Sequence, residues 1–307
     1  MSRRIEDFSY FFDFWKHRAD KIKYSIFKRI STKALPMFFK GQDIISNAPI
    51  TSGVHEAEIK DLIDFSAANG YSDFFIDIGA NIGLTSCQSG LNFKEIHMFE
   101  PNPNILNILK VNTKIMLRNH PYTIHECGLG DEEAVLDLYV PFDNWGGAFV
   151  MSDKSTYDKN LLSAKDGYGD FDINNYEILK VKIAAAKDYL TRLFNSLNDK
   201  NLRSGVIKID VEGFEKLVIG QLLSAFPANF KAVLVFENWK DDLNLSDFTI
   251  PDRVSVQAYS IVSEKIRFKS LPRFVNSLIS FAKGGFHMRL EKVEHQFKPG
   301  NCVFIVN

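Results

Sequence analysis

Short apolar runs separated by helical stretches dominate the chain after about residue 70. Four of these runs are almost continuously apolar, which is typical of parallel strands buried between layers of helices. They are Phe74–Ala80, Glu95–Glu100, Val206–Ile209 and Lys231–Glu237. Tyr122–Cys127 and Leu179–Ala184 also have β character, and Ala134–Val140 alternates between apolar and polar residues as a half-buried strand does.

Helical periodicity fills most of the gaps between these runs. Helices are expected over Pro103–Arg118, Lys187–Leu197, Glu215–Phe226 and, with an interruption near Pro272, Ser255–Ala282. Two final runs, Phe286–Val293 and Cys302–Val306, are expected to pair as a terminal hairpin. This order predicts an α/β fold, a mostly parallel sheet covered by helices on both faces. Functional residues in such sheets lie beyond the carboxyl ends of the strands.

The first 50 residues form a separate arm in this pattern, and residues 51–307 form the α/β domain. Residues 1–40 hold ten Lys and Arg residues but only four acids. Their aromatic side chains follow helical spacing at Phe8, Phe11, Phe12 and Trp15. We expect a helix whose apolar face docks on the domain. Two alternatives remain open: a basic amphipathic helix on an anionic membrane surface, and a contact between two copies of the chain.

Residues 141–178 have weak periodicity and are rich in Gly, Asp, Asn and aromatic residues. An irregular segment of this length inside an α/β unit is unusual and often functional. We therefore expect an insertion on the substrate side of the domain. Within it, Asn144 and Trp145 are candidate substrate-binding residues, because an aromatic ring can stack on a sugar face. An ordinary Asn-Gly-rich turn is the alternative.

Composition narrows the classes of function. The chain has 307 residues with a net charge of -1, so it lacks the positive field of a protein that binds nucleic acid over its whole surface. Three widely spaced cysteines suggest a reducing compartment. The sequence shows neither a signal peptide nor an apolar stretch long enough to span a bilayer. We expect a cytoplasmic protein, with the arm as the one candidate for contact with the inner membrane face.

The first two predicted strands end in residues that suit a nucleoside. After Asp77, the turn Gly79-Ala80-Asn81-Ile82-Gly83 leads from strand to helix, and glycines there allow a ligand to approach the backbone. Asn81 replaces the second glycine of the dinucleotide fingerprint, which favours a nucleoside without a diphosphate. Glu100 ends the second strand, where an acid usually accepts hydrogen bonds from ribose hydroxyls.

Carboxylates follow the later strands. Asp210 and Glu212 would point the same way if their strand continued through both, so that one could orient an acceptor and the other take its proton. Glu237, at the end of the next strand, would face the same region. These three acids could instead hold a divalent cation, and Glu212 could simply cap the following helix. Lone histidines, His55 among them, are interpreted as structural.

Four segments together carry a resemblance to a known family. FFIDIGANIG, MFEPNPNILNILKVN, IKIDVEGFEKLVIGQLL and VLVFENW, spread over about residues 70–240, resemble the FkbM family of S-adenosylmethionine-dependent methyltransferases. The resemblance implies the class I methyltransferase (Rossmann-like) fold, with a seven-stranded, mostly parallel sheet. It also implies S-adenosylmethionine as cofactor and O-methylation of a small polar acceptor, most often a sugar or glycan.

The resemblance also implies roles for individual residues. The turn Gly79–Gly83 would wrap the methionine part of the cofactor with help from Asp77, and Glu100 would bind the ribose. Asn102 would line the adenosine side, and Cys127 and Gly128 would lie near adenine. Asp210, Glu212 and Glu237 would act at the reacting methyl. Two other functions stay open, a nicotinamide-dependent oxidoreductase on the same kind of sheet and a non-catalytic module that binds the cofactor.

Overall fold

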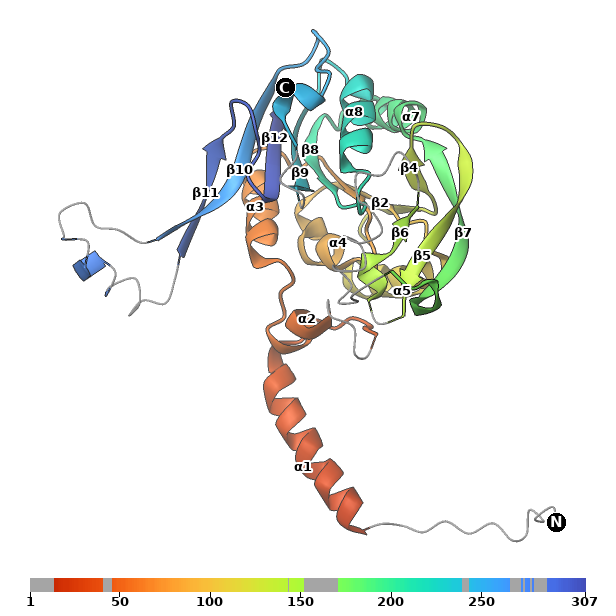
Figure 1. Ribbon diagram of the computed structural model, residues 1–307, viewed down its shortest axis with the longest axis vertical. Coiled ribbons are helices and arrows are strands. Elements are labelled where there is room, and N and C mark those ends of the chain that lie inside the picture. Colours follow the sequence, from red (N-terminus) through yellow and green to blue (C-terminus); the bar gives the residue numbers. More distant parts are fainter. Residues whose placement is uncertain are drawn as a thin grey trace.

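The computed structural model contains a mixed β-sheet with helices on both faces and a second, smaller sheet beside it (Figure 1). The structure describes residues 14–40, 46–142, 144–151, 171–238, 243–265, 272, 274–276, 278 and 286–307. A helical arm leads away from this body at the amino-terminal end of the described chain.

The large sheet has eight strands in the order β11-β10-β12-β9-β8-β1-β2-β3. In chain order they are β1 (Phe74–Ile78), β2 (Glu95–Phe99), β3 (Tyr122–His125), β8 (Ser204–Ile209), β9 (Lys231–Asn238), β10 (Val256–Lys265), β11 (Phe286–Lys292) and β12 (Gly300–Val306). The five strands β3, β2, β1, β8 and β9 are parallel, whereas β12 is antiparallel to β9 and to β10, and β10 is antiparallel to β11. The expected α/β architecture is therefore present, but the predicted count of seven strands is wrong, because β11 adds an edge strand.

The alternation of side chains along the strands divides the core into two layers. Phe74, Ile76 and Ile78 face the layer that holds α7 (Ala186–Asp199) and α8 (Glu215–Ala225). Phe75 faces the opposite layer, with α3 (Ala57–Ala68) and α5 (Pro103–Met116), while α4 (Leu84–Ser89) packs beside α5. Because β1 pairs with β8 in parallel register, Asp77 lies directly opposite Lys208, and the alternation places both on the α3 side.

Two predictions about the carboxyl-terminal part are wrong. Residues 256–265 form strand β10 rather than a helix. Consecutive side chains face opposite layers of the core, as they do in a strand: Ala258 is buried in one layer and Tyr259 packs against the other. The expected terminal hairpin does not form either, because β10 lies between β11 and β12 and pairs with both. Such non-local pairing cannot be read from the spacing of two apolar runs.

The small sheet has the order β4-β7-β5-β6. Its strands are β4 (Gly128–Gly130), β5 (Ala134–Pro141), β6 (Phe149–Val150) and β7 (Tyr176–Ala185). The segment 141–178 thus begins and ends in strands of this sheet, with short 3-10 helices at Trp145–Gly147 and Ile173–Asn175. Residues 143 and 152–170 of the expected insertion lie outside the described residues.

The arm consists of α1 (Phe14–Ile30), a 3-10 turn at Ser31–Lys33 and, after residues 41–45, the short helix α2 (Asn47–Thr51). Phe8, Phe11 and Phe12 lie outside the described residues, and the side chain of Trp15 is not described. Every described side chain of α1 is exposed, so this part of the helix does not dock on the domain as expected. No described helix combines the length and apolar character that crossing a bilayer requires.

Candidate active site

A cavity of about 600 Å³ lies beyond the carboxyl ends of the central parallel strands, within the size range of small-molecule sites. The turn after β1, Glu100 after β2, Asp210 after β8 and Glu237 at the end of β9 line one side. The small sheet contributes Gly128 and neighbouring apolar residues to the other side, and Trp145 lies at its border. The structure thus brings together residues from four strand ends that the sequence places up to 158 positions apart.

The turn after β1 has a backbone that side chains rarely allow. Gly79 has φ +86°, and a Cβ there would lie 1.8 Å from the carbonyl oxygen of Asp210. Asn81 also has a left-handed backbone, with φ +51°. Gly79, Ala80 and Asn81 line the cavity, whereas Gly83 precedes α4 and packs toward Leu109. The glycine at 79 is therefore required by the neighbouring strand connection, independently of any ligand.

Asp77 lies beneath the cavity rather than on its surface. Its side chain is buried, and Ser86 Oγ donates a 2.6 Å hydrogen bond to Oδ2. Within the described residues, Oδ1 is buried without a hydrogen-bond partner. Burial raises the pKa of Asp77, while the nearby Lys208 opposes that rise. Asp77 therefore forms part of the floor of the site, and its direct contact with the cofactor stays a prediction.

Glu100 is held by the backbone on both sides. Its Oε1 accepts a 2.8 Å hydrogen bond from the amide of Asn102, and its Oε2 accepts one of 2.9 Å from the amide of Asn81. Burial raises the pKa of Glu100 to about 7, although the two amide hydrogen bonds lower it. Each carboxylate oxygen has a second acceptor position, so the group can still receive two hydroxyl donors from the cavity.

Asn102 has a structural role that the sequence only partly indicated. Its side chain is fully buried and accepts a 3.0 Å hydrogen bond from the amide of Asn104, which caps α5 with Pro103 at the first helical position. Asn102 does not line the cavity, and neither does Cys127, whereas Gly128 and Leu129 do. On the side expected to hold adenine, strand β4 therefore contributes the lining residues Gly128 and Leu129.

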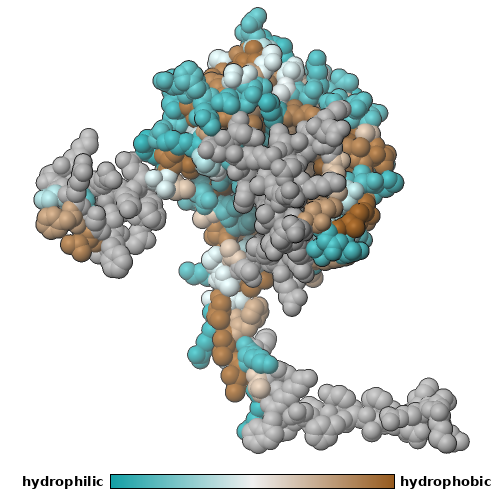
Figure 2. Space-filling view, in the orientation of Figure 1, coloured by the Kyte–Doolittle hydropathy of each residue, from teal (hydrophilic) through white to brown (hydrophobic). Residues whose placement is uncertain are grey.

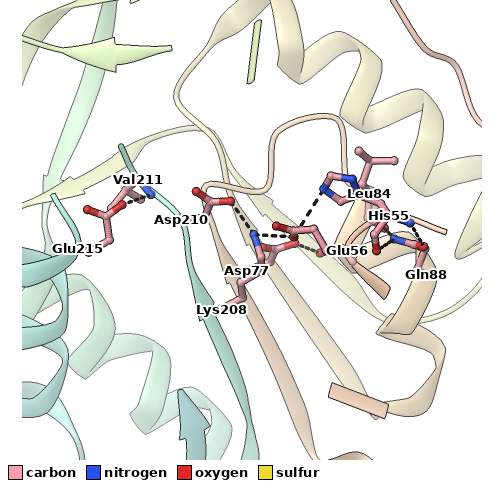
Figure 3. Close-up of polar contacts among 10 residues, drawn as sticks. His55, Glu56, Asp77, Leu84, Gln88, Lys208, Asp210, Val211 and Glu215 are labelled. Carbon is pink, nitrogen blue, oxygen red and sulfur yellow. Dashed lines mark hydrogen bonds and ion pairs between the residues drawn. The ribbon is translucent and has the colours of Figure 1, made fainter. Parts of the chain in front are cut away.

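A buried lysine organises the acids at the floor of the site (Figure 3). Lys208 Nζ lies 2.7 Å from Asp210 Oδ2 and 3.8 Å from Glu56 Oε2. Burial alone would lower the pKa of Lys208, but the carboxylates of Asp210, Glu56 and Asp77 outweigh it and raise the pKa. The amine therefore stays charged, and it holds the Asp210 side chain, which is 37% exposed, against the cavity.

His55 and Glu56 are site residues that sequence reasoning missed. Both line the cavity, and His55 Nε2 lies 3.6 Å from Glu56 Oε2. The backbone amide of His55 donates to Gln88 Oε1 at 2.9 Å, which attaches this segment to α4. Burial lowers the pKa of His55 despite the neighbouring carboxylate, so the imidazole is neutral near pH 7. Neither residue belongs to the recognised motifs, and only their position before α3 could have drawn attention to them.

The two acids after β8 do not share a strand, because β8 ends at Ile209. Glu212 instead has a left-handed backbone with φ +44°, is largely buried and lines the cavity together with Asp210 and Glu237. The acid that accepts hydrogen bonds from the turn before α8 is Glu215, from Val211 N at 3.3 Å and Gly213 N at 2.9 Å. The predicted alignment of Asp210 and Glu212 along a strand is wrong, although both face the same cavity.

Trp145 and Asn144 line the cavity where the insertion was expected to cover the acceptor. Lys40 Nζ lies 4.4 Å from the centroid of the Trp145 ring and also donates to the carbonyl oxygen of Phe142. Lys40 therefore covers one face of the indole, and Trp145 also packs against the apolar clusters around Leu84 and Leu138. Within the described residues, no group of three or more His, Cys, Asp or Glu side chains converges as a metal site would require, so Asp210, Glu212 and Glu237 do not form one.

The parallel strands, with a glycine turn after β1 and an acid after β2, define a Rossmann-like domain with a nucleoside-type site. The family model of the methyltransferase FkbM domain matches residues 77–249, more than half of the chain. The protein belongs to the FkbM methyltransferase family, which confirms the resemblance found in the sequence.

Solved structures resemble the chain only distantly. The methyltransferase FkbM from Methylobacillus flagellatus KT is 16% identical, with 70% of this chain and 49% of that chain covered and a TM-score of 0.29. The O-methyltransferase from Bacillus cereus in complex with SAH is 9% identical over 99% of this chain and 95% of that chain, with a TM-score of 0.36. Curated protein sequences contain no significant match. Likenesses this distant carry no argument about substrate.

Proposed function

We propose that this protein is an S-adenosylmethionine-dependent O-methyltransferase that acts on a hydroxyl group of a small polar acceptor, a sugar or glycan. One observation carries the proposal: a single cavity is lined both by the nucleoside-type residues Gly79–Asn81 and Glu100 and by carboxylates at the ends of β8 and β9. A methyl donor and an acceptor that bind in one cavity can be aligned for in-line transfer.

The residues present fit the cofactor. Glu100 has free acceptor positions for the two ribose hydroxyls, and the buried Oδ1 of Asp77, which has no hydrogen-bond partner in the described chain, can accept a further donor near the turn. The carboxylates around the cavity suit the positive charge of a sulfonium. When bound, the cofactor supplies a methyl group that is already activated, so the protein has to position the acceptor and manage its proton.

Asp210 is the residue we assign to the acceptor hydroxyl. Its carboxylate is ion-paired to Lys208 on one oxygen, faces the cavity and is exposed enough to be reached by a substrate. A carboxylate that accepts the hydroxyl hydrogen bond orients the oxygen and takes its proton as the new O–C bond forms. Glu237 and Glu212 line the same region and would bind other acceptor hydroxyls. The indole of Trp145 in the cavity lining suits the apolar face of a sugar.

The neutral imidazole of His55 supports the same chemistry. It lines the cavity on the side of Glu56, so a proton released at Asp210 has a second basic group within the site. The positive charge of the Lys208 amine offsets part of the negative charge of Asp210, Glu56 and Asp77, so these three carboxylates can lie near one another. We assign Lys208 and Glu56 a positioning role. Lys208 is ion-paired with Asp210, and Glu56 lies beside His55, whereas Asp210 and His55 are the groups that can take the acceptor proton.

Two experiments test the function. Calorimetric titration with S-adenosylhomocysteine and, separately, with NAD distinguishes a methyltransferase from an oxidoreductase, and tight binding of NAD alone would overturn the proposal. Incubation with methyl-labelled S-adenosylmethionine and host-cell extract, followed by mass analysis, should yield an acceptor that is one methyl group heavier. A labelled amine or thiol product would overturn the O-methyl assignment, and cofactor binding without any labelled product would favour a non-catalytic module.

A further inference from the structure

The helix α1 presents large apolar side chains to solvent along its length. Ile22, Ile26, Phe27 and Ile30 are between 52% and 62% exposed, although such side chains are usually buried. Ile22, Ile26 and Ile30 follow one another at intervals of four residues, which places them on one side of the helix. Figure 2 shows these hydrophobic residues running along α1 beside hydrophilic ones. An exposed apolar stripe of this length indicates a surface that binds a partner.

The charges around this stripe indicate what the partner is. Between Phe14 and Lys33 the sequence holds seven basic residues and a single acid, Asp20. The described basic side chains of α1 are exposed, including Lys21, Lys28 and Arg29. Since the whole chain carries -1, the rest of it carries a net negative charge, so the domain itself would be repelled by an anionic surface. The arm is therefore the part of the chain that attracts one.

A second stretch of the sequence is also rich in basic and apolar residues. The segment between β10 and β11, residues 265–286, contains five basic residues and no acid. Within its described part, Phe274 is 69% and Leu278 is 62% exposed. Two separate stretches of the chain thus combine basic residues with exposed large apolar side chains, a combination that suits the interface of an anionic bilayer.

The geometry points to an anionic lipid bilayer as the partner of α1: we propose that this helix lies flat in the headgroup region, with Ile22, Ile26 and Ile30 inserted and its basic residues on lipid phosphates. The helix is about 25 Å long and too highly charged to span the bilayer. A second copy of α1 fits less well as the partner, because packing two stripes together would bring two sets of basic flanks into contact with only Asp20 on each to offset them.

Because α1 is connected to the domain through residues 31–40, binding of α1 to a bilayer would also hold the domain close to that bilayer. The segment that follows α1 is tied to the cavity wall, because Phe38 exchanges hydrogen bonds with the side chain of Asn112 on α5. Met37 is buried beside Leu84, and Lys40 lies over the Trp145 ring that borders the cavity. The segment that links α1 to the domain therefore contacts Trp145, which lines the cavity.

Vesicle sedimentation of the full chain tests the proposal. The protein should bind vesicles of phosphatidylcholine with about 30% phosphatidylglycerol at least tenfold more tightly than vesicles of phosphatidylcholine alone. Raising the salt to about 0.5 M should weaken this binding, because it screens the basic residues. The variant Ile22→Ser/Ile26→Ser/Ile30→Ser should lose at least about tenfold in binding, and Lys21→Glu/Lys28→Glu/Arg29→Glu should lose it selectively on anionic vesicles.

The matched control replaces exposed apolar residues on the domain, Phe65→Ser/Leu91→Ser/Val135→Ser, which have similar exposure and should bind vesicles as the parent protein does. Binding of S-adenosylhomocysteine and thermal unfolding check that all variants fold. Absence of binding to anionic vesicles, or equal loss in the control, would overturn the proposal. So would a dimer in solution that the isoleucine variant converts to a monomer without any effect on vesicles, since the stripe would then be a self-association surface.

Discussion

Glu100 combines a buried carboxylate with two backbone hydrogen bonds, so its charge changes near neutral pH. Burial raises its pKa to about 7. Ribose hydroxyls donate to the ionised form, so bound cofactor lowers this pKa, and affinity should increase with pH until the free carboxylate is fully ionised. We expect the Kd for S-adenosylhomocysteine to fall by up to about tenfold per pH unit between pH 6 and 7 and to level off above pH 8. Calorimetry at three pH values measures this.

The variant Glu100→Gln should bind S-adenosylhomocysteine about 10- to 100-fold more weakly at pH 8, because it loses hydrogen bonds to a charged group. Its affinity should also no longer depend on pH in this range. Glu126→Gln is the control, since that side chain is 54% exposed and is not part of the cavity lining. A parent protein whose affinity is the same at pH 6 and 8 would remove Glu100 from the ribose role.

Asp210 is the residue whose substitution separates binding from transfer. Asp210→Asn keeps the size of the side chain but cannot accept the hydroxyl proton. We expect methyl transfer to fall by about 10²–10⁴-fold while the Kd for S-adenosylhomocysteine changes little. The matched control is Asp137→Asn, which also removes a carboxylate paired with a lysine, Lys180 at 2.6 Å, but outside the cavity. Full transfer activity in Asp210→Asn would refute the assignment.

For single residues, the sequence predicted the site residues that directly follow a strand within a recognised motif. It missed the residues that come to the cavity from another part of the chain through tertiary packing. Glu100 and Asp210 were predicted because each ends an apolar run. His55 and Glu56 carry no local signal, since they reach the cavity only through the packing of the segment before α3. Lys208 lies inside an apolar strand, and the register of β1 against β8, which the sequence does not show, is what places it opposite Asp77.

Among the elements, β8 lies too close to β1 at Gly205 to leave room for a side chain. A Cβ on Gly205 would lie 2.2 Å from the carbonyl oxygen of Phe74 and 2.4 Å from its ring, so the two strands would have to separate. Gly205→Ala should therefore lower the free energy of unfolding by about 2 kcal/mol or more. Gly220→Ala in α8 is the control: nothing lies within 4 Å of its Cβ, and it should stabilise the helix by about 0.5–1 kcal/mol. Denaturant unfolding compares them, and equal stability of Gly205→Ala and the parent would contradict the packing argument.

The helices and strands that the sequence predicted correctly are those whose apolar residues follow a single clear pattern along the chain. The buried strands β1, β2, β8 and β9 are short and almost continuously apolar, and α5, α7 and α8 have a distinct apolar side. The strand β10 was missed because Ser255–Ala282 was treated as one periodic stretch. Its true limits depend on pairing with β12, which lies more than 40 residues later in the chain.

At the scale of the whole molecule, two sets of buried groups have opposite effects on stability. Acids with raised pKa bind more protons in the folded state, so each lowers the free energy of unfolding as the pH rises. These are Asp77, Glu100 and Glu215, the last two with pKa about 7. Histidines with lowered pKa bind fewer protons when folded, so each raises that free energy with pH. These are His55, His97 and His125, the last two with pKa about 4.

Between about pH 4.5 and 6.5, Glu100 and Glu215 lower the free energy of unfolding as the pH rises, whereas His97 and His125 raise it, each by about 1.4 kcal/mol per pH unit. We therefore expect the unfolding free energy of the ligand-free protein to change little in this window. The double variant Glu100→Gln/Glu215→Gln removes two of the acids and leaves the histidines. Relative to the parent, its stability should rise with pH by up to about 2.8 kcal/mol per unit. Urea unfolding at half-unit pH steps measures this slope, and Glu126→Gln/Glu133→Gln, on exposed positions, should run parallel to the parent. A constant difference between the buried variant and the parent would mean that these carboxyl groups titrate alike in the folded and unfolded chain.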